Sequence, residues 1–483
     1  MSSGPSREQF RQWAKSYTVL PIWRELVADL TTPVAAFARL VRDEPGFILE
    51  SVENGERWSR FSFVGRRPRA TLTATGRHVE IDGDLGIDVP TDQGILATIE
   101  ALLKVYRSPV VDELPPMHGG LVGYLGYDVV REIEKLPDVP EDQLGLPDAS
   151  LMIVGQIAAF DHWRQRVALI ENFADDGASG LDEPLLTPPN SDDPLPDVRS
   201  TMSGGDFQRA VDAAKELIRA GDIFQVVLSQ RFDFDLDADP FDVYRVLRQI
   251  NPSPYMYFVR TADVSLAGAS PEPLVRVESG RVISRPIAGT RRRGKTDAED
   301  RALGAELAED PKERAEHVML VDLARNDIGR VIEYGSMQID ELMVLEHYSH
   351  VMHLTSQVSG ELRAGLTPVD VIRATLPAGT LSGAPKVRAM EIIDDFEPSK
   401  RGPYGGVVGY IDFNGNLDTA ICIRTMAITA NGASVQAGAG VVYDSDPQLE
   451  HNECYHKASA LLAAVPAAER LTAARRAQRK AQS

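Results

Sequence analysis

The sequence predicts an α+β fold in which two packed antiparallel β-sheets form a β-sandwich flanked by helices. Short apolar runs, such as Phe47–Val52 and Phe224–Phe232, recur between helical segments, and the run Trp58–Gly65 has alternating side chains. Hairpin-like pairs of such runs, one of them turning at Gly76, favour antiparallel neighbours. Strands and helices that come in runs, rather than in strict alternation, are typical of packed sheets with helices outside them.

Helices are predicted where capping residues precede a run of good helix formers. Ser203 is typical of an N-cap, and Gly221 is placed to end the same helix. Pro311 suits the first position of a second helix, which contains no glycine before Gly329. A third helix is predicted around Glu450, near the end of the fold.

The chain divides at residues 174–202, an acidic stretch rich in Pro, Gly and Ser that is typical of a linker. We expect an α+β region over residues 1–173 and a second domain over residues 203–465. The Ala- and Arg-rich tail, residues 466–483, is either helical or frayed.

Composition excludes several classes of protein. The 483 residues are 43% hydrophobic and 25% charged, which is ordinary for a soluble globular protein. A net charge of -20 argues against nucleic acid as a main partner, although it leaves room for a small anionic substrate in a basic pocket. Two cysteines cannot form a disulfide framework or a cysteine-based zinc site. The N-terminus lacks a signal-peptide core and no apolar run is long enough to span a membrane, so we expect a cytoplasmic protein.

Two predicted helices carry paired acids. Glu313 and Glu316 are three residues apart on one helix face, and Glu450, Glu453 and Lys457 share a face of the other. Such pairs usually belong to a solvated face. Two helices that each offer a glutamate pair could instead hold one hard cation such as Mg²⁺ between them, and apolar residues that continue the first stripe favour an inward direction.

Familiar catalytic loops are missing. The segment Gly379–Lys386, G-T-L-S-G-A-P-K, lacks the Lys directly after the second Gly that a phosphate-binding loop requires. No G-x-S-x-G, H-E-x-x-H or G-x-G-x-x-G motif occurs in a suitable context. Nucleotide binding is therefore not predicted.

The second half contains a series of long, ordered motifs. It resembles the chorismate-utilising enzymes, and above all the large subunit (component I) of anthranilate synthase; the first half resembles that subunit more weakly. The resemblance covers about residues 203 to 460 and rests on Ser270–Arg276, Arg285–Gly294, Asp310–Arg330, His350–Ser356, Leu376–Lys386, Arg401–Tyr410, Ile423–Thr425, Gln436–Gly440 and the Glu450 helix. It implies the component I-like fold, a chorismate-binding catalytic domain over residues 203–465 and a regulatory role for residues 1–173.

The same resemblance implies a metal site. Glu316 and Glu453 would bind Mg²⁺, with Glu313 and Glu450 behind them. The metal would bind the ring carboxylate of chorismate, neutralise its charge and orient the substrate.

Catalytic and substrate-binding residues follow from the resemblance as well. Glu272 resembles the general acid that protonates the departing ring hydroxyl, His353 the histidine implicated in pyruvate loss, and Thr380 a residue of the pocket. A lone histidine is otherwise more often a satisfied core residue. The implied substrate-binding residues are Gly289, Thr290, Tyr404, Arg424, Gly438, Ala439, Gly440 and Lys457. Arg424 and Tyr404 would hold the enolpyruvyl carboxylate, and the backbone N–H groups of residues 438–440 could approach an anion closely.

Two positions indicate the nucleophile and the product. Relatives that attack with water carry a Lys base where this chain has Gln225, and ammonia needs no such base. Aminodeoxychorismate synthase carries a Lys where this chain has Ala288. The resemblance thus implies the first step of tryptophan biosynthesis, anthranilate formation from chorismate and ammonia supplied by a glutamine amidotransferase subunit (component II) in a hetero-oligomer. The alternatives are a 2-amino-2-deoxyisochorismate or aminodeoxychorismate synthase and, in another class, a non-catalytic tryptophan-sensing homologue.

A regulatory site is also implied by the resemblance. Two segments match the elements that bind tryptophan in feedback-inhibited enzymes, and the residues expected to bind L-tryptophan as an inhibitor are Glu50, Ser51, Asn251, Pro254, Tyr255 and Met256. The other interpretation is that Ser51 merely ends a strand and that the aromatic residues pack in the core.

Overall fold

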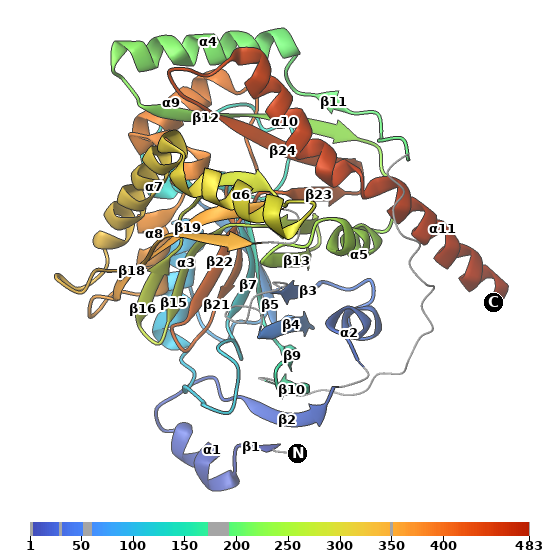
Figure 1. Cartoon of the computed structure of the whole chain (residues 1–483). Helices are drawn as coiled ribbons and strands as arrows, with labels where there is room; N and C mark the ends of the chain where they lie inside the picture. The colour runs from blue at the N-terminus through green and yellow to red at the C-terminus, as the bar shows by residue number, and fades with distance from the viewer. Residues whose placement is uncertain (1–2, 29–30, 52–59, 172–192, 348–350, 483) are drawn as a thin grey trace.

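The computed structural model describes residues 3–28, 31–51, 60–171, 193–347 and 351–482. Two large antiparallel β-sheets pack together with helices around them (Figure 1), which confirms the predicted fold class. The fold therefore has a core between the sheets and further cores between each sheet and its helices.

In the described part of the chain, the first sheet runs through twelve strands in spatial order, with a short thirteenth strand paired to one of them. The order is β1 (Ser3–Gly4), β2 (Ile22–Val27), β10 (Arg166–Glu171), β9 (Gln156–Asp161), β4 (Phe61–Arg66), β3 (Gly46–Glu50), β13 (Tyr255–Arg260), β14 (Ser265–Ser270), β23 (Thr425–Thr429), β24 (Gly432–Val441), β12 (Gln225–Phe234) and β11 (Arg199–Ser200), with β20 (Gly383–Ala384) paired to β12.

The second sheet has eleven strands among the described residues. The order is β17 (Ile287–Arg292), β19 (Val351–Glu361), β16 (Arg281–Ser284), β15 (Pro273–Glu278), β22 (Leu417–Ile421), β21 (Val407–Ile411), β7 (Leu121–Leu125), β8 (Ala149–Ile153), β5 (Ala70–Thr75) and β6 (His78–Gly83), with β18 (Gln338–His347) paired to β19.

Both sheets combine strands from the two sides of the predicted linker. In the first sheet β3 pairs with β13, with Glu50 opposite Met256, and in the second β7 pairs with β21. The division at residues 174–202 remains a prediction, because most of that stretch lies outside the described residues. What the topology does establish is that the segments before and after it share both sheets, so neither side has a sheet of its own.

Alternating side chains explain how the sheets pack. On β3, Phe47 faces the core between the sheets and Ile48 faces the helices, and on β13 the same holds for Tyr257 and Phe258. Successive side chains of a strand point to opposite faces, and both faces of these strands are apolar. These strands are consequently buried on both sides.

Helices cover the outer faces of both sheets (Figure 1). The helices are α1 (Arg7–Trp13), α2 (Pro33–Leu40), α3 (Ile95–Val105), η1 (Tyr127–Glu132), α4 (Gly204–Ala220), α5 (Pro240–Ile250), α6 (Asp297–Glu309), α7 (Pro311–Gly329), α8 (Pro368–Thr375), η2 (Gly379–Leu381), α9 (Lys386–Phe396), α10 (Pro447–Leu462) and α11 (Val465–Gln482). Helices α2, α5 and α11 pack on the first sheet, whereas α3, α7 and α8 pack on the second. Within the described ranges, none of these helices is both long and apolar enough to cross a membrane.

Local sequence signals for two helices are confirmed. The Ser203 hydroxyl accepts the N–H of Asp206 at the start of α4, and Gly221 ends that helix with a φ of 84°. At α7, the Asp310 side chain caps the first turn and Pro311 occupies its first position. The residues at the start of both helices therefore have the capping roles that the local sequence indicates.

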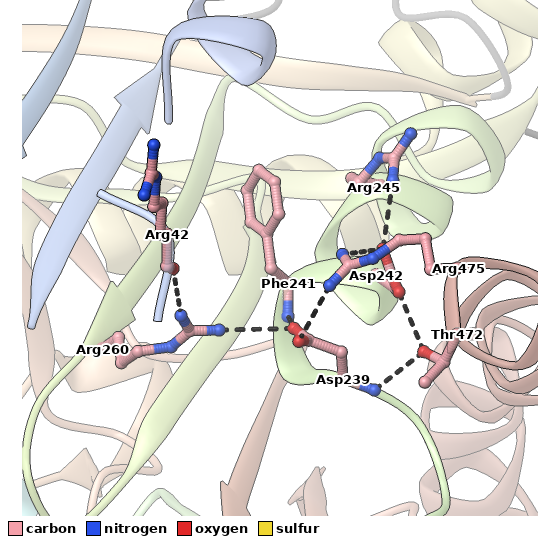
Figure 2. A network of polar contacts seen from close by, with 8 residues as sticks. All are labelled: Arg42, Asp239, Phe241, Asp242, Arg245, Arg260, Thr472 and Arg475. Atoms are coloured by element: carbon pink, nitrogen blue, oxygen red, sulfur yellow. Dashed lines mark hydrogen bonds and ion pairs between the residues drawn. The ribbon is translucent and has the colours of Figure 1, made fainter. Parts of the chain in front are cut away.

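The C-terminal tail is a docked helix, α11, and not a frayed end. Figure 2 shows its anchor on the N-terminus of α5: the buried Asp242 accepts from Thr472 Oγ1 at 2.8 Å and from Arg475 Nη1 at 3.0 Å. Arg475 Nη2 also donates to Asp239, at 3.3 Å. A carboxylate with no exposed surface needs such partners, so α11 holds the start of α5 in place.

Candidate active site

A single cavity of about 970 Å³, measured with the solvent at its mouth, gathers most of the predicted substrate-binding and catalytic residues. Those that line it are Glu272, Thr290, His353, Thr380, Tyr404, Arg424, Gly438, Gly440 and Lys457. They come from β17, β19, η2, β24, α10 and the loops that precede β15, β21 and β23. Residues more than 180 positions apart in the chain thus converge on one space.

Gly289 and Ala439 are predicted residues that do not line this cavity. Ala439 lies between Gly438 and Gly440 on β24, so its side chain points to the opposite face, where it packs in an apolar core with Leu228. Gly289 has a φ of 65°, a conformation that favours glycine, and its carbonyl oxygen contacts His353.

Glu272 is held as a weak acid at the cavity wall. Burial raises the pKa of its carboxyl to about 7, although a hydrogen bond from Thr380 and the charge of Lys457 favour the carboxylate. The Thr380 Oγ1 donor lies 2.9 Å from Glu272 Oε1. A carboxyl with this pKa is protonated for a large fraction of the time near neutral pH, so it can donate a proton to a leaving group.

His353 has a defined tautomer. Its Nδ1 lies 2.9 Å from the carbonyl oxygen of Gly289 and 3.0 Å from Thr290 Oγ1. Because a carbonyl can only accept, Nδ1 carries the hydrogen and Nε2 retains its lone pair. Burial, together with the charge of Arg424, lowers the pKa of His353, which favours this neutral form. The imidazole can therefore accept a proton.

Arg424 and Tyr404 form a place for an anion. Within the described chain the Arg424 guanidinium has no hydrogen-bond acceptor, and burial lowers its pKa. The phenol of Tyr404 lies beside Gly438, where an added Cβ would be only 2.7 Å from the hydroxyl oxygen. A partly buried guanidinium with free donors is suited to a carboxylate, which it can bind through two hydrogen bonds.

Lys457 connects this region to the predicted metal-binding acids. Its Nζ donates to the carbonyl oxygen of Gly438 at 2.8 Å and pairs with Glu453 Oε1 at 2.6 Å. Burial and then the charge of Glu453 raise the pKa of Glu450, and the charge of Glu453 also favours the charged form of Arg424. The acidic face of α10 is therefore continuous with the cavity.

The four predicted metal-binding glutamates do not form one compact cluster. Among the described residues, no group of three His, Cys, Asp or Glu side chains lies close enough together to hold a metal ion. Glu316 lies near Lys312, at 3.8 Å, and Glu453 pairs with Lys457; their side chains are 42% and 48% exposed. Glu313 accepts a hydrogen bond from Arg291 instead, at 3.0 Å.

The acidic stripe of α7 is half-buried and lies beside the fully buried face of the helix. The buried face of this helix is formed by His317, Val321, Ala324 and Ile328, one position further along the chain. Leu320 and Leu323, which continue the acidic stripe, border a smaller cavity beside Glu272. Spacing alone specified the face that the acids share, but not which neighbouring face the sheet would cover.

The charge pattern of these acids nevertheless fits a divalent cation. Partial burial and the neighbouring charges of Glu313 and Asp310 raise the pKa of Glu316, and partial burial and Glu453 do the same for Glu450. The charge of Lys312 on α7 opposes the rise in the pKa of both Glu316 and Glu450. The acidic ends of α7 and α10 therefore lie near each other. Carboxylates that repel each other in this way are the donors a hard cation would neutralise.

A second cavity, of about 1100 Å³ with its opening included, contains five of the six residues predicted to bind an inhibitor: Glu50, Ser51, Pro254, Tyr255 and Met256. Asn251 does not line it; this residue ends α5. Glu50 accepts from Tyr244 at 2.6 Å and pairs with Arg248 at 2.7 Å. The two cavities share Pro271 and Ile287 as lining residues, so only a thin wall separates them.

Several lining residues were not among the predictions. Gln436 and Val227 line the first cavity, and Gln436 lies two positions before Gly438 on β24. Because a strand repeats every two residues, Gln436 could have been found once Gly438 was placed. Val227 faces the cavity from β12, and nothing in its local sequence signals that position.

The sequence and the fold match those of a known class of enzymes. A family model described as chorismate binding enzyme matches residues 47–463. Anthranilate synthase component 1 of Acetivibrio thermocellus is 45% identical over 485 aligned residues, which cover 95% of this chain and 98% of the relative. The protein of that name from Pseudomonas putida is 46% identical, over 97% of this chain and 100% of the relative. The chain therefore belongs to the chorismate-binding enzymes.

Within that family the predicted resemblance to component 1 of anthranilate synthase is confirmed by these relatives and by a solved structure. Anthranilate synthase component I from Streptococcus pneumoniae superimposes with a TM-score of 0.75 at 37% identity, covering 91% of this chain and 99% of that one. The menaquinone-specific isochorismate synthase of Escherichia coli superimposes with a TM-score of 0.68 at 16% identity, over 95% and 98% of the two chains, and shares the fold.

Proposed function

We propose that the protein converts chorismate and ammonia to anthranilate and pyruvate, as the large subunit of an anthranilate synthase in tryptophan biosynthesis. The main observation is that one cavity combines a carboxyl with a pKa of about 7, a neutral imidazole and an arginine with free donors. The similarity to component 1 chains supports the proposal.

Chorismate carries two carboxylates, and the cavity offers a partner for one of them directly. Arg424 and Tyr404 would bind the enolpyruvyl carboxylate, a planar anion that matches a guanidinium. Backbone N–H groups near Gly438 and Gly440 can approach the substrate because no side chain intervenes at these positions. Glu316 and Glu453, with Glu313 and Glu450 behind them, would hold Mg²⁺, which when bound neutralises and orients the ring carboxylate.

The first step is the addition of ammonia with loss of water. The nitrogen lone pair forms a bond to ring C2, the double bonds shift, and the bond from C4 to its hydroxyl breaks. Glu272 donates its proton to the departing hydroxyl, which leaves as water, and the carboxylate can regain a proton from the new ammonium group. The pKa of about 7 suits both directions of this transfer.

The second step is the elimination of pyruvate from the resulting 2-amino-2-deoxyisochorismate. A base removes the proton on C2 while the bond from C3 to the enolpyruvyl oxygen breaks, so the ring becomes aromatic. Nε2 of His353 retains the lone pair needed to take that proton, since Nδ1 donates to Gly289. The released enolpyruvate gains a proton at its methylene carbon and becomes pyruvate.

The sequence favours ammonia over water as the nucleophile. Ammonia attacks without a base, and at the position where water-using relatives carry a lysine this chain has Gln225. We infer that a glutamine amidotransferase subunit supplies the ammonia and forms a hetero-oligomer with this chain. The name component 1 of the similar chains supports such a partner.

The test is the conversion of chorismate by the purified chain with Mg²⁺ and an ammonium salt. The proposal predicts a rising fluorescence from anthranilate, dependent on both additions. A synthase that stops at 2-amino-2-deoxyisochorismate would consume chorismate without fluorescence, and a non-catalytic sensing homologue would leave chorismate unchanged. Either result would contradict the proposal.

We further propose that L-tryptophan inhibits the enzyme by binding in the second cavity. Glu50, Ser51, Pro254, Tyr255 and Met256 line that cavity, and the wall shared at Pro271 and Ile287 would connect it to Glu272. Asn251 does not line the cavity, so it would affect inhibitor binding only indirectly, through the backbone of residues 251–256. Inhibition curves for wild type and Ser51→Phe test this: the variant should keep its turnover and lose most inhibition, and unchanged inhibition would refute the proposal.

A further inference from the structure

Arg401 is a fully buried arginine that lies behind the wall of the candidate active-site cavity. Its side chain is only 1% exposed, and its partner Glu397 is 4% exposed. Arg401 Nε lies 2.8 Å from Glu397 Oε2 and Nη2 lies 2.6 Å from Oε1, a bidentate pair. Neither residue lines the cavity itself.

The guanidinium also binds two cavity walls through their backbones. Arg401 Nη1 donates to the carbonyl oxygen of Leu381 at 2.6 Å, and Nη2 donates to that of Val227 at 2.8 Å. Leu381 follows Thr380 in the η2 turn, and Thr380 donates to Glu272. One side chain therefore fixes both the turn that carries the Glu272 partner and the facing strand β12.

Two further parts of the cavity wall, Tyr404 and strand β24, also contact the Arg401–Glu397 pair, directly or through Ser229. The Arg401 guanidinium lies over the ring of Tyr404, with 5.5 Å between Cζ and the ring centroid. Glu397 Oε1 accepts from Ser229 N and from Ser229 Oγ, both at 2.8 Å. Gln436 Nε2 in turn donates to Ser229 Oγ at 2.8 Å, which links β24 to the network.

We propose that the Arg401–Glu397 pair is a positioning device for the reaction, which holds the Thr380–Leu381 turn, β12, Tyr404 and Gln436 in the arrangement that catalysis requires. This inference rests on the proposed function of the cavity. The pair acts through its neighbours and does not touch the substrate.

Stability alone does not explain a pair of this kind. A fully buried ion pair loses its hydration, and replacing such pairs with apolar residues is often neutral or stabilising. An arginine, however, has five N–H donors in a rigid fork, so it can bind a carboxylate and two carbonyl groups at once. Lysine keeps the charge but cannot reach all of these acceptors in the same geometry.

The test compares three variants with wild type in the ammonia-dependent reaction at 25 °C. Arg401→Lys keeps the charge, the double variant Arg401→Met with Glu397→Leu removes it, and Arg475→Lys is a matched control in a buried carboxylate network outside the cavity. We expect both Arg401 variants to lose about 10- to 100-fold in kcat, with KM for chorismate changed less, because a small misplacement of catalytic groups is that costly. The control should keep kcat within about twofold of wild type, since its contacts do not reach the cavity.

The pH profile separates positioning from folding. If the Thr380–Leu381 turn moves, Glu272 loses the hydrogen bond that favours its carboxylate, so the alkaline limb of kcat/KM should shift to higher pH in the Arg401 variants only. A folded Arg401→Lys chain with wild-type kcat and pH profile would overturn the proposal. Failure of both Arg401 variants to fold would also overturn it, because the pair would then serve stability. Absence of turnover by the wild type would instead contradict the proposed function.

Discussion

Replacing Thr380 with valine would test the role of Glu272 most sharply. Valine resembles threonine in shape but lacks the hydroxyl that donates to Glu272 Oε1 at 2.9 Å. That hydrogen bond stabilises the carboxylate and lowers the pKa of Glu272, so its loss must raise this pKa. In the proposed reaction the protonated acid is the active form, so the variant should remain active to higher pH than the wild type.

The size of the shift follows from the geometry. A hydrogen bond to a charged group contributes about 1.5–3 kcal/mol, and one pKa unit corresponds to about 1.4 kcal/mol. Water that enters the open cavity can replace part of the lost hydrogen bond. We therefore expect the lower end of this energy range, which raises the pKa of Glu272 by about one unit. The apparent pKa on the alkaline side should thus move from near 7 to roughly one unit higher.

The assay is the pH profile of kcat/KM for chorismate, followed by anthranilate fluorescence. Free NH₃ must be held constant, because its fraction in an ammonium salt rises with pH. Serine at position 380 is the matched control, since it keeps the hydroxyl and should keep the wild-type profile. A valine variant whose alkaline limb stays in place, or moves to lower pH, would refute the assignment of Glu272 as the acid held by this bond.

Three other changes have defined outcomes. Glu272→Gln removes the proton donor and should lower kcat about 10²- to 10⁴-fold while the chain still binds chorismate, as turnover and equilibrium binding would show. In Gly438→Ala the new Cβ would lie 2.7 Å from the Tyr404 hydroxyl, so KM for chorismate should rise about tenfold; an unchanged KM would place the substrate elsewhere. Arg475→Met leaves the buried Asp242 with fewer partners and should reduce the free energy of unfolding by about 2 kcal/mol without loss of kcat, as urea denaturation and activity together would reveal.

Much of the fold follows from local chemistry. The caps of α4 and α7 and the hairpin turn at Gly76 were predictable, because each depends on residues within one turn of the chain. Local chemistry also explains the break between β16 and β17, where Pro286 lies. Proline has no N–H for a sheet, which explains the interruption.

The arrangement of the halves was not predictable in the same way. The linker composition suggested two separate domains, yet β3 pairs with β13 and β7 with β21. Pairing between distant strands depends on long-range contacts that leave no local signal. The end of the predicted run Phe47–Val52 lies outside the described ranges, so it stays a prediction.

In the candidate site, too, some features could be predicted from the sequence and others depend on long-range contacts. Family motifs located the cavity residues, and the alternation of β24 explains why Gly438 and Gly440 face it while Ala439 does not. The contribution of Arg401 was hidden, because two of its partners, Leu381 and Val227, come from other segments of the chain. The metal-binding role of Glu316 and Glu453 remains a proposal, and Mg²⁺ titration of chorismate binding by their Gln variants would test it.

The most direct measurement is the stoichiometry of a complete conversion of chorismate with Mg²⁺ and ammonia. In the proposed reaction Glu272 and His353 serve successive steps in one cavity, so anthranilate and pyruvate should each form in an amount equal to the chorismate consumed. Chorismate that disappears without an equal release of pyruvate would contradict the two-step reaction proposed for this site.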